Sequence, residues 1–291
     1  MTYDLKAYAD NGKNLEFSWD SGLVISDISG LTSVVVNMAT SQGVTQVGTS
    51  IQDESVNGKD LVIKGTLVGD SALSRKQLID TFVPEVPVTL VYNNELELRV
   101  KPKVTPDVSR HESNAKFQVT VYAAYPYWSK MDKIIINVGG LEPMFSFPIN
   151  YGETDLEDPK THMFGRRIQS FFVNAENQGN VSAPFDLIFY AKTQVSNPSL
   201  TKVDTGEVIK INRNMVAGEK VSVYMTEDQP RVTSTIGGSE IDIFNDLDYY
   251  STLFELDVGD NLVRYDATVN RDNLDCLLVP MAAFSGAYTY G

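Results

Sequence analysis

The chain has 291 residues, of which 42% are hydrophobic, and it carries a formal net charge of −14. This length allows one large or two ordinary domains with a sizeable core, while the negative charge argues against specific nucleic-acid binding, which depends mainly on Lys and Arg at phosphates. No apolar run approaches the ~20 residues of a membrane helix, and the N-terminus lacks the basic and apolar regions of a signal peptide. We therefore expect that the protein is made in a cytoplasm and does not insert into a membrane.

The first predicted elements are two strands separated by a long polar stretch. Ser33–Thr40 contains the β-branched run Val34, Val35 and Val36, which favours a strand, and the polar stretch Ser41–Gly58 is typical of a long hairpin loop. Asp60–Val68 alternates with a period of two. It therefore predicts a second strand, with one face carrying Leu61, Ile63 and Leu67.

One helix is expected after these strands. Residues at helical spacing over Ala72–Val83 predict it, Asp70 or Ser71 can cap its start, and Pro84 ends it because proline cannot continue a helix. We expect its apolar side to carry Ala72, Ile79, Phe82 and Val83.

A hairpin and a further strand complete the first half. Val86–Tyr92 and Glu95–Val104 flank Asn93-Asn94, a pair that suits a tight turn with positive φ. Lys116–Ala123 predicts another strand, and Tyr125-Pro126-Tyr127-Trp128 closes the half. We therefore expect a first domain over residues 1–130.

The chain changes character after residue 130. Gly and Pro punctuate residues 131–167, which also contain an acidic stretch, and this composition indicates a connector or loop excursion. Residues 168–291 contain many short apolar segments separated by turn residues, a pattern typical of a β-sandwich or jelly-roll-like domain. The expected strands are Ile168–Asn174, Pro184–Ala191, Val208–Asn212, Lys220–Met225, Thr252–Leu256, Asn261–Tyr265 and Asp275–Met281.

Several short segments share the order and spacing of one protein family. In the first half they are Val24–Leu31, the helix residues Ser74–Leu78 and the closing Tyr125–Trp128; in the second half they are Asn180–Phe185, Asn197-Pro198, Thr205–Ile211, Tyr250–Leu256 and Gly259-Asp260-Asn261. With these segments the sequence resembles the distal tail proteins (Dit) of siphophages, also called the phage tail component family. The resemblance covers nearly the whole chain. Two departures are Ala124-Tyr125 before Pro126, where the family has Asp, and a longer, more acidic connector after Trp128.

The resemblance implies a fold and a role. The fold would be mainly β: an N-terminal tail-tube-like β domain with one helix and a C-terminal galectin-like or carbohydrate-module-like sandwich. The role would be that of a structural virion protein at the tip of a long non-contractile tail, after assembly in the host cytoplasm. Six copies would form a ring around an open channel for DNA, with the tail tube protein above and the tail-associated fibre or lysin hub of the baseplate below. In some relatives the outer domain also carries receptor-binding proteins.

Ring contacts are expected where strand edges of one copy meet the next, since a head-to-tail interface that closes satisfies such edges. By analogy with tube-like folds, we expect the strands Ser33–Thr40 and Asp60–Val68 to make them. The residues concerned are Val34, Val35, Val36, Leu61, Ile63 and Leu67.

Motifs of catalysis or metal binding are lacking in the sequence. His111 and His162 lie in polar loop sequences outside any paired-ligand pattern, and the chain contains no Gly-x-Ser-x-Gly, P-loop or Gly-x-Gly-x-x-Gly motif. Cys276 lies among apolar residues and is expected to be a buried, inert thiol. We therefore expect no cofactor, no metal and no enzymatic activity. The acidic groups are interpreted as solvated loops rather than cation sites: Glu153, Asp155, Glu157 and Asp158, and Asp242, Asp246 and Asp248.

Two alternatives to a purely structural role remain open. A carbohydrate-binding module would use aromatic side chains to stack on a host surface polymer, although aromatics more often pack in cores. The candidates are Tyr249, Tyr250, Phe254, Tyr265 and Phe284, with Tyr249 and Tyr250 preferred. A cell-envelope hydrolase would need a catalytic constellation; the sequence shows none of the Ser, Cys or zinc type, while a pair of carboxylates can come from anywhere in a chain.

Overall fold

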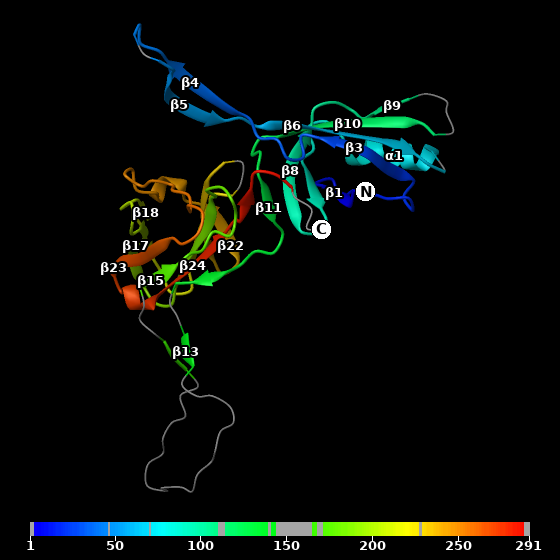
Figure 1. The fold of residues 1–291 in the computed structure, drawn as a ribbon. Coiled ribbons are helices and arrows are strands. Elements are labelled where there is room, and N and C mark those ends of the chain that lie inside the picture. The colour runs from blue at the N-terminus through cyan, green and yellow to red at the C-terminus, as the bar shows by residue number, and fades with distance from the viewer. Residues whose placement is uncertain are drawn as a thin grey trace, which may run out of the picture. The chain divides into compact units, whose positions relative to one another are not determined.

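The computed structural model describes residues 3–45, 47–69, 71–109, 114–138, 141–143, 165–167, 171–226 and 229–287. Within these residues the chain is mainly β, with the single α-helix α1 (Ser71–Thr81), which confirms the expected fold class. The chain divides into two compact units (Figure 1), and each is described by itself. Unit 1 comprises Met1–Asp132, Gly179–Val181 and Ala282–Gly291; unit 2 comprises Lys133–Gln178 and Ser182–Met281.

The division differs from the expected domains 1–130, 131–167 and 168–291 at the C-terminal end. The short strand β25 (Ala283–Phe284) pairs with β11 (Trp128–Lys130), so this segment belongs to unit 1 rather than to the sandwich. The expected connector also contains structure: β12 (Ile136–Asn137) pairs with β24 (Leu274–Pro280), and β13 (Leu141–Pro143) pairs with β14 (Gly165–Arg167). The β11–β25 and β12–β24 pairings join residues that are distant in sequence, and β13 and β14 are very short. A local sequence pattern therefore does not indicate these pairings.

Unit 1 contains two antiparallel sheets that share β8 (Leu96–Pro102). One sheet runs through β2 (Asn14–Phe17), β1 (Leu5–Ala9), β7 (Val88–Tyr92), β8, β11 and β25; the other runs through β10 (Lys116–Ala123), β6 (Lys59–Leu67) and β3 (Leu23–Ser29), with β9 (Asp107–Val108) beside β10. Alternate residues of both sheets enter one core, as the period of two requires.

The helix forms as expected, but it buries a different side. Leu78 and Phe82 are fully buried, together with Ser74 and Thr81, while Ala72, Ile79 and Val83 are exposed. The difference arises because Ser74 lies toward the β2–β3 turn, where its hydroxyl donates a hydrogen bond to the carbonyl of Ser21 at 3.0 Å. A polar residue on the buried side thus shifts the helix away from its apparent apolar face.

The hairpin between β7 and β8 turns at Asn93 and Asn94, whose φ angles are 54° and 53°. Two consecutive residues with positive φ match the type I′ turn that the right-handed twist of a hairpin favours. The Glu95 N–H closes this turn on the Tyr92 carbonyl at 3.1 Å, and the strands then pair from Tyr92 opposite Leu96.

A second hairpin projects from unit 1 and is made of β4 (Val36–Ser41) and β5 (Ser50–Val56), as Figure 1 shows. Residues 50–56 were expected in a loop, and the structure corrects this, because the segment pairs with β4 along its length with a bulge between Ala39 and Thr40. Nearly every residue of the hairpin is exposed. The sequence therefore lacks the burial-driven alternation that marks a strand.

Unit 2 is a sandwich of two antiparallel sheets around one core. The first sheet has the order β12, β24, β16 (Phe185–Ala191), β20 (Lys220–Tyr224), β21 (Arg231–Ile236) and β22 (Ser239–Asp242). The second has the order β15 (Phe172–Asn174), β23 (Leu262–Val269), β17 (Val195–Lys202) and β18 (Val208–Lys210), with β19 (Asn214–Met215) beside β17. Cys276 is completely buried in this core, and burial raises the pKa of its thiol. The reactive thiolate is therefore disfavoured, as expected of an inert buried cysteine.

Several strand assignments of the second half differ from expectation, including β17, β21 and Thr252–Leu256. β17 was missed because Asn197, with φ of 50°, and Pro198 interrupt its pattern, yet the strand continues through both. β21 was missed because Thr233 and Ser234 are buried polar residues in its middle. Thr252–Leu256, expected as a strand, makes only an isolated bridge between Leu256 and Ala183.

Candidate functional site

The β4–β5 hairpin presents one apolar face to solvent. Cross-strand pairing places Val36 opposite Val56 and Met38 opposite Glu54, and the bulge brings Ile51 opposite Thr40 on the same face. Of these side chains, Met38 is 54% and Ile51 53% exposed. The opposite face is polar and small, with Asn37, Ala39, Ser41, Ser50, Asp53 and Ser55. The hairpin is therefore amphipathic, and its apolar face is exposed among the residues that the structure describes.

An isolated two-stranded hairpin is marginally stable in water and normally packs its apolar face on another element. Val35, which precedes β4 at the base of the hairpin, is also apolar and 60% exposed. This combination indicates a surface that becomes buried on association.

The six residues expected at ring contacts separate into two groups. Val35 and Val36 are exposed, and Val34 is partly exposed, so they can contact another molecule. Leu61, Ile63 and Leu67 are each at most 1% exposed and form part of the core of unit 1, which corrects the expectation for them. The reason is topological: β6 lies between β10 and β3, so its apolar face points into the protomer and both its edges are paired.

Open strand edges lie elsewhere in unit 1. In the part of the chain that the structure describes, β2 and β3 end the sheet path and pair with a strand on one side only. Unpaired backbone N–H and C=O groups on such edges are templates for pairing with another chain. The outer edges of β2 and β3 are thus available to a neighbour.

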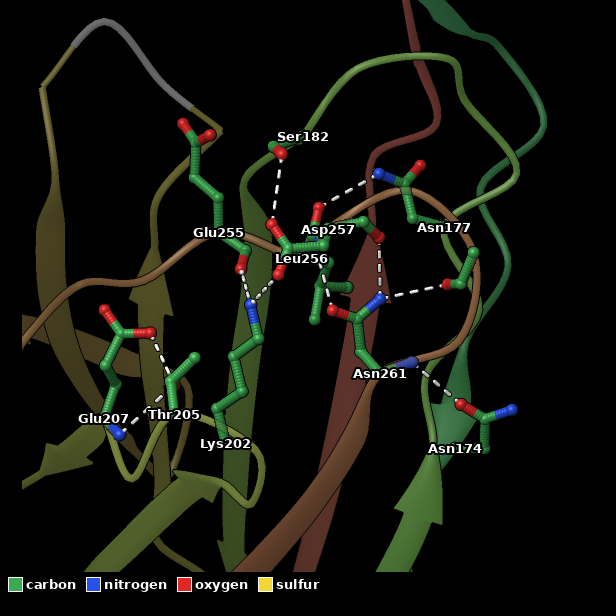
Figure 2. Close-up of polar contacts among 11 residues, drawn as sticks. Asn174, Asn177, Ser182, Lys202, Thr205, Glu207, Glu255, Leu256, Asp257 and Asn261 are labelled. Atoms are coloured by element: carbon green, nitrogen blue, oxygen red, sulfur yellow. Dashed lines mark hydrogen bonds and ion pairs between the residues drawn. The ribbon is translucent and has the colours of Figure 1, made fainter.

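Unit 2 carries a network of polar side chains around the loop from Asp257 to Asn261 (Figure 2). The buried Asn261 side chain donates to the carbonyls of Asp257 and Gly259 at 2.7 and 3.0 Å, and accepts the backbone N–H of Asp257 at 2.8 Å. Gly259 has φ of 86°, a conformation that glycine adopts without strain. Asn177 adds a side-chain hydrogen bond to the Leu256 carbonyl at 3.0 Å.

Lys202 forms the second half of this network, and Figure 2 shows its ammonium group directed at the same loop. It donates to the Glu255 carbonyl at 3.1 Å and to Asp257 Oδ2 at 2.7 Å, while Ser182 donates to Asp257 Oδ1 at 3.2 Å. Hydrogen bonding by Lys202 holds the pKa of Asp257 below its usual range, whereas burial raises the pKa of Glu255. Because Asp257 is occupied by Lys202 and Ser182, the arrangement is suited to fixing the loop.

Unit 2 also contains a buried network of ion pairs between Arg213, Glu219 and Asp246. Glu219 is 1% exposed; its carboxylate pairs with Arg213 and accepts hydrogen bonds from the Ser234 hydroxyl at 2.6 Å and the Val216 N–H at 2.9 Å. Arg213 also pairs with Asp246 at 2.7 Å. The partners lower the pKa of Glu219 against the opposing effect of burial. With each charge so matched, the network is structural.

The carboxylates of the acidic group Asp242, Asp246 and Asp248 all accept hydrogen bonds from nearby residues of unit 2. Asp242 accepts the Phe244 N–H, Asp246 pairs with Arg213, and Asp248 accepts from Asn212 and Tyr250. Among the described residues, no group of three or more His, Cys, Asp or Glu side chains is arranged to hold a metal ion, and no helix is long and apolar enough to cross a membrane. His111, His162 and the acidic cluster Glu153, Asp155, Glu157 and Asp158 lie outside the described residues.

Tyr249 and Tyr250, suggested by sequence as glycan-stacking residues, lie at the surface of unit 2 with 93% and 87% of their area exposed. The other aromatics of that set, Phe254, Tyr265 and Phe284, are buried in cores. The structure therefore separates the five candidates into an exposed pair and three packing residues.

Comparison with known proteins agrees with the fold. Residues 178–274 match the family model described as siphovirus-type tail component, C-terminal domain. This range includes Ser182, Lys202, Asp257 and Asn261 of the loop network. No curated protein sequence matches the chain.

Two solved structures resemble nearly the whole chain. The crystal structure of the Dit protein (gp 19.1) of phage SPP1, described as a paradigm of hub adsorption apparatus in Gram-positive infecting phages, matches with a TM-score of 0.64 and 11% identity over 96% of this chain and 99% of that chain. A chain of the phage P2 baseplate in its activated conformation with Ca matches with a TM-score of 0.55 and 13% identity over 97% of this chain and 98% of that chain. The resemblance to the siphophage distal tail proteins is thereby confirmed at the level of the fold, and residues 178–274 match the C-terminal domain model of the siphovirus-type tail component.

Proposed function

We propose that the chain is a structural virion protein that forms a homo-hexameric ring at the tip of a long non-contractile siphophage tail. Its ring joins the tail tube protein to the tail-associated fibre or lysin protein of the baseplate and leaves a channel for DNA. Assembly takes place in the host cytoplasm, and the outer unit is available to receptor-binding proteins. This role is non-enzymatic.

The observation that carries the proposal is the amphipathic β4–β5 hairpin. Its apolar face, with Val36, Met38, Ile51 and Val56, is exposed among the described residues of unit 1, which is explained if a neighbouring copy covers it. The edges of β2 and β3 supply a second means of association, since a neighbour can complete their unpaired backbone groups. In a closed ring every copy uses the same two surfaces, so none is left open.

The comparisons support the location. The similar structures are a Dit protein described as a hub of an adsorption apparatus and a phage baseplate. The net charge of −14 is compatible with a conduit, because a channel that lets DNA pass should not grip phosphates with Lys and Arg.

The experiment compares two double variants of the same hairpin. Met38→Lys with Ile51→Lys places two charges on the apolar face, and Asn37→Lys with Ser55→Lys places two charges on the polar face, where these residues face each other across the strands. Light scattering coupled to size-exclusion chromatography should show the first variant as a folded monomer, while the second assembles like the unmodified chain. Equal assembly of both variants, or equal loss in both, would contradict a contact through the apolar face.

A further inference from the structure

The exposed pair Tyr249 and Tyr250 forms a corner of two aromatic rings. Their ring centroids are 5.4 Å apart and their planes meet at 86°. With 93% and 87% of their areas exposed, both residues leave their apolar rings in water, although aromatic side chains gain much by burial. Two neighbouring aromatic rings that both remain exposed to solvent indicate a surface that contacts a ligand.

The turn that carries the rings is firmly held. Asp248 accepts hydrogen bonds from the Tyr250 N–H and the Asn212 side chain, each at 2.9 Å, and its carboxylate lies 3.6 Å from the Lys210 ammonium group. Asn212 and the Tyr250 N–H hold the pKa of Asp248 below its usual range, so the carboxylate is ionised and keeps these bonds at neutral pH. Ser251 ties the turn to β18, accepting the Lys210 N–H at 2.9 Å and donating to the Lys210 carbonyl at 3.2 Å.

This rigidity matters because a preorganised surface loses little conformational entropy when it binds a ligand. Tyrosine suits such a surface, since its ring is large and stiff and its hydroxyl can donate or accept a hydrogen bond. The rings therefore form a prepared platform rather than a mobile loop tip.

The surroundings decide which ligand fits. The side chains that hydrogen-bond or ion-pair in the turn are Asn212, Asp248, Ser251 and Lys210, so polar and charged groups lie beside the rings. A large apolar protein face would leave these groups unpaired, which is costly. A nucleic acid is disfavoured by the net charge of −14.

A saccharide ring meets both requirements of the corner. One face of a pyranose presents C–H groups whose partial positive charge suits the negative face of an aromatic ring, while its edge carries hydroxyls. Against perpendicular rings, one tyrosine can stack on the C–H face as the other borders the edge. Asn212 is exposed and the Lys210 side chain is 40% exposed, so both can donate hydrogen bonds to hydroxyls beside the platform.

We propose that the Tyr249–Tyr250 corner is a binding site for a neutral saccharide. The site lies within unit 2 and does not depend on hexamer assembly, so a single chain should bind the saccharide. A hexamer would present six copies, and simultaneous engagement would raise a weak single-site affinity on a repeating surface polymer.

Saturation-transfer-difference NMR on the full chain tests the site directly. The probes are the methyl glycosides of glucose, galactose, N-acetylglucosamine and rhamnose. We expect saturation transfer to the ring C–H protons of at least one probe, reduced about fivefold or more in Tyr249→Ala and in Tyr250→Ala, as loss of one stacking partner implies. Tyr249→Phe, which keeps the ring, should retain most of the signal.

Tyr190→Ala is the matched control, because Tyr190 is a 41% exposed tyrosine on β16 of the same unit. Its signal should equal that of the unmodified chain, and unchanged circular dichroism of the Ala variants separates lost contact from lost fold. The absence of transfer to all four probes would overturn the proposal. So would transfer that survives in both Ala variants, or that Tyr190→Ala reduces equally. Failure of ring assembly would leave this result unaffected.

Discussion

Lys59, the first residue of β6, buries an ammonium group without a hydrogen-bond partner among the described residues. Its Nζ atom lies 5.8 Å from the centre of the Trp128 ring, and burial lowers its pKa from 10.5 to about 8. Below pH 8 the amine is protonated in the folded and the unfolded chain, and the folded chain bears the cost of the buried charge. Between about 8 and 10.5 the folded chain releases its proton first, so its stability should rise with pH.

Replacing this charge should therefore stabilise the protein. We expect Lys59→Met to raise the free energy of unfolding at pH 7 by about 1 to 3 kcal/mol. The upper limit is the cost of the buried charge, which follows from the fall in pKa from 10.5 to about 8 at 1.36 kcal/mol per pKa unit. Urea unfolding at pH 7 and pH 9.5 measures both this gain and its decrease at the higher pH. Lys64→Met, at an exposed position of the same strand, is the control and should change little. A less stable Lys59→Met, or a gain that is equal at both pH values, would contradict the assignment.

Asn261 is the residue on which the loop network of unit 2 depends. Its side chain makes three hydrogen bonds and is 1% exposed, so Asn261→Ala removes all three. The Asp257 carbonyl and N–H then lose these partners, while the Gly259 carbonyl keeps the Asn177 N–H at 2.8 Å. We expect a loss of about 2 to 3 kcal/mol in the free energy of unfolding, at roughly 1 kcal/mol per bond. Asn245→Ala, at an exposed position of the same unit, should cost little by the same urea measurement. Equal stability of the two variants would remove the loop network from the account.

The sequence could indicate some of these residues and not others. The segment Gly259-Asp260-Asn261 was visible as part of the family resemblance, but the role of Asn261 depends on carbonyls that only the folded loop brings to it. Tyr249 and Tyr250 were candidates by residue type alone, and their exposure separates them from buried Phe254 and Tyr265. Leu61, Ile63 and Leu67 were misassigned because an apolar strand face looks the same whether it meets a core or a neighbour.

At the scale of elements, β6 requires a glycine at a position where it lies between β3 and β10. A Cβ atom at Gly65 would lie 2.3 Å from the Val24 carbonyl oxygen and 2.5 Å from the Phe117 ring. Both neighbours belong to paired strands and cannot withdraw without disturbing the sheet. The glycine thus lets the ring of Phe117 cover the β6 backbone.

We expect Gly65→Ala to destabilise unit 1 by about 2 kcal/mol or more, as overpacking in a core typically costs 1 to 3 kcal/mol. Hydrogen exchange should show faster exchange of the β3, β6 and β10 amides, with unchanged protection in unit 2. Thr66→Ala, at the next and half-buried position, serves as the control. Unchanged protection of these three strands in Gly65→Ala would refute the close approach.

Elements with one buried face were predictable, and exposed ones were not. β6, β10 and the β7–β8 hairpin alternate because a core selects apolar residues at every second position. β5 escaped detection because its residues Ser50–Val56 are almost wholly exposed, so no core imposes an alternation on them. If a neighbouring copy covers the hairpin, its apolar face is selected by that copy rather than by the protomer.

At the scale of the whole molecule, the two-unit organisation was predicted but its boundary was not. The C-terminal strand β25 returns to β11 across more than half of the chain, a pairing for which a local pattern carries no signal. Periodicity indicated the mainly β class, and the family resemblance added the particular fold that the chain shares with SPP1 Dit.

Charge should govern how easily copies associate. Each chain carries a net charge of −14, so approaching copies repel one another, and salt screens that repulsion over a shorter distance as its concentration rises. We expect the assembled fraction at fixed protein concentration to increase between 50 and 500 mM NaCl, as an interface through apolar hairpin faces is not weakened by screening. Sedimentation velocity across this range measures it. Dissociation at high salt would point to an interface built from ion pairs instead.

The central claim is that identical copies of this chain close into a ring of six around an open channel. Negative-stain electron microscopy of the purified full chain, with class averaging of end-on views, tests it most directly. The account predicts particles with sixfold symmetry and a stain-filled centre. Particles the size of a single folded chain at micromolar concentration, or open filaments without closure, would contradict it.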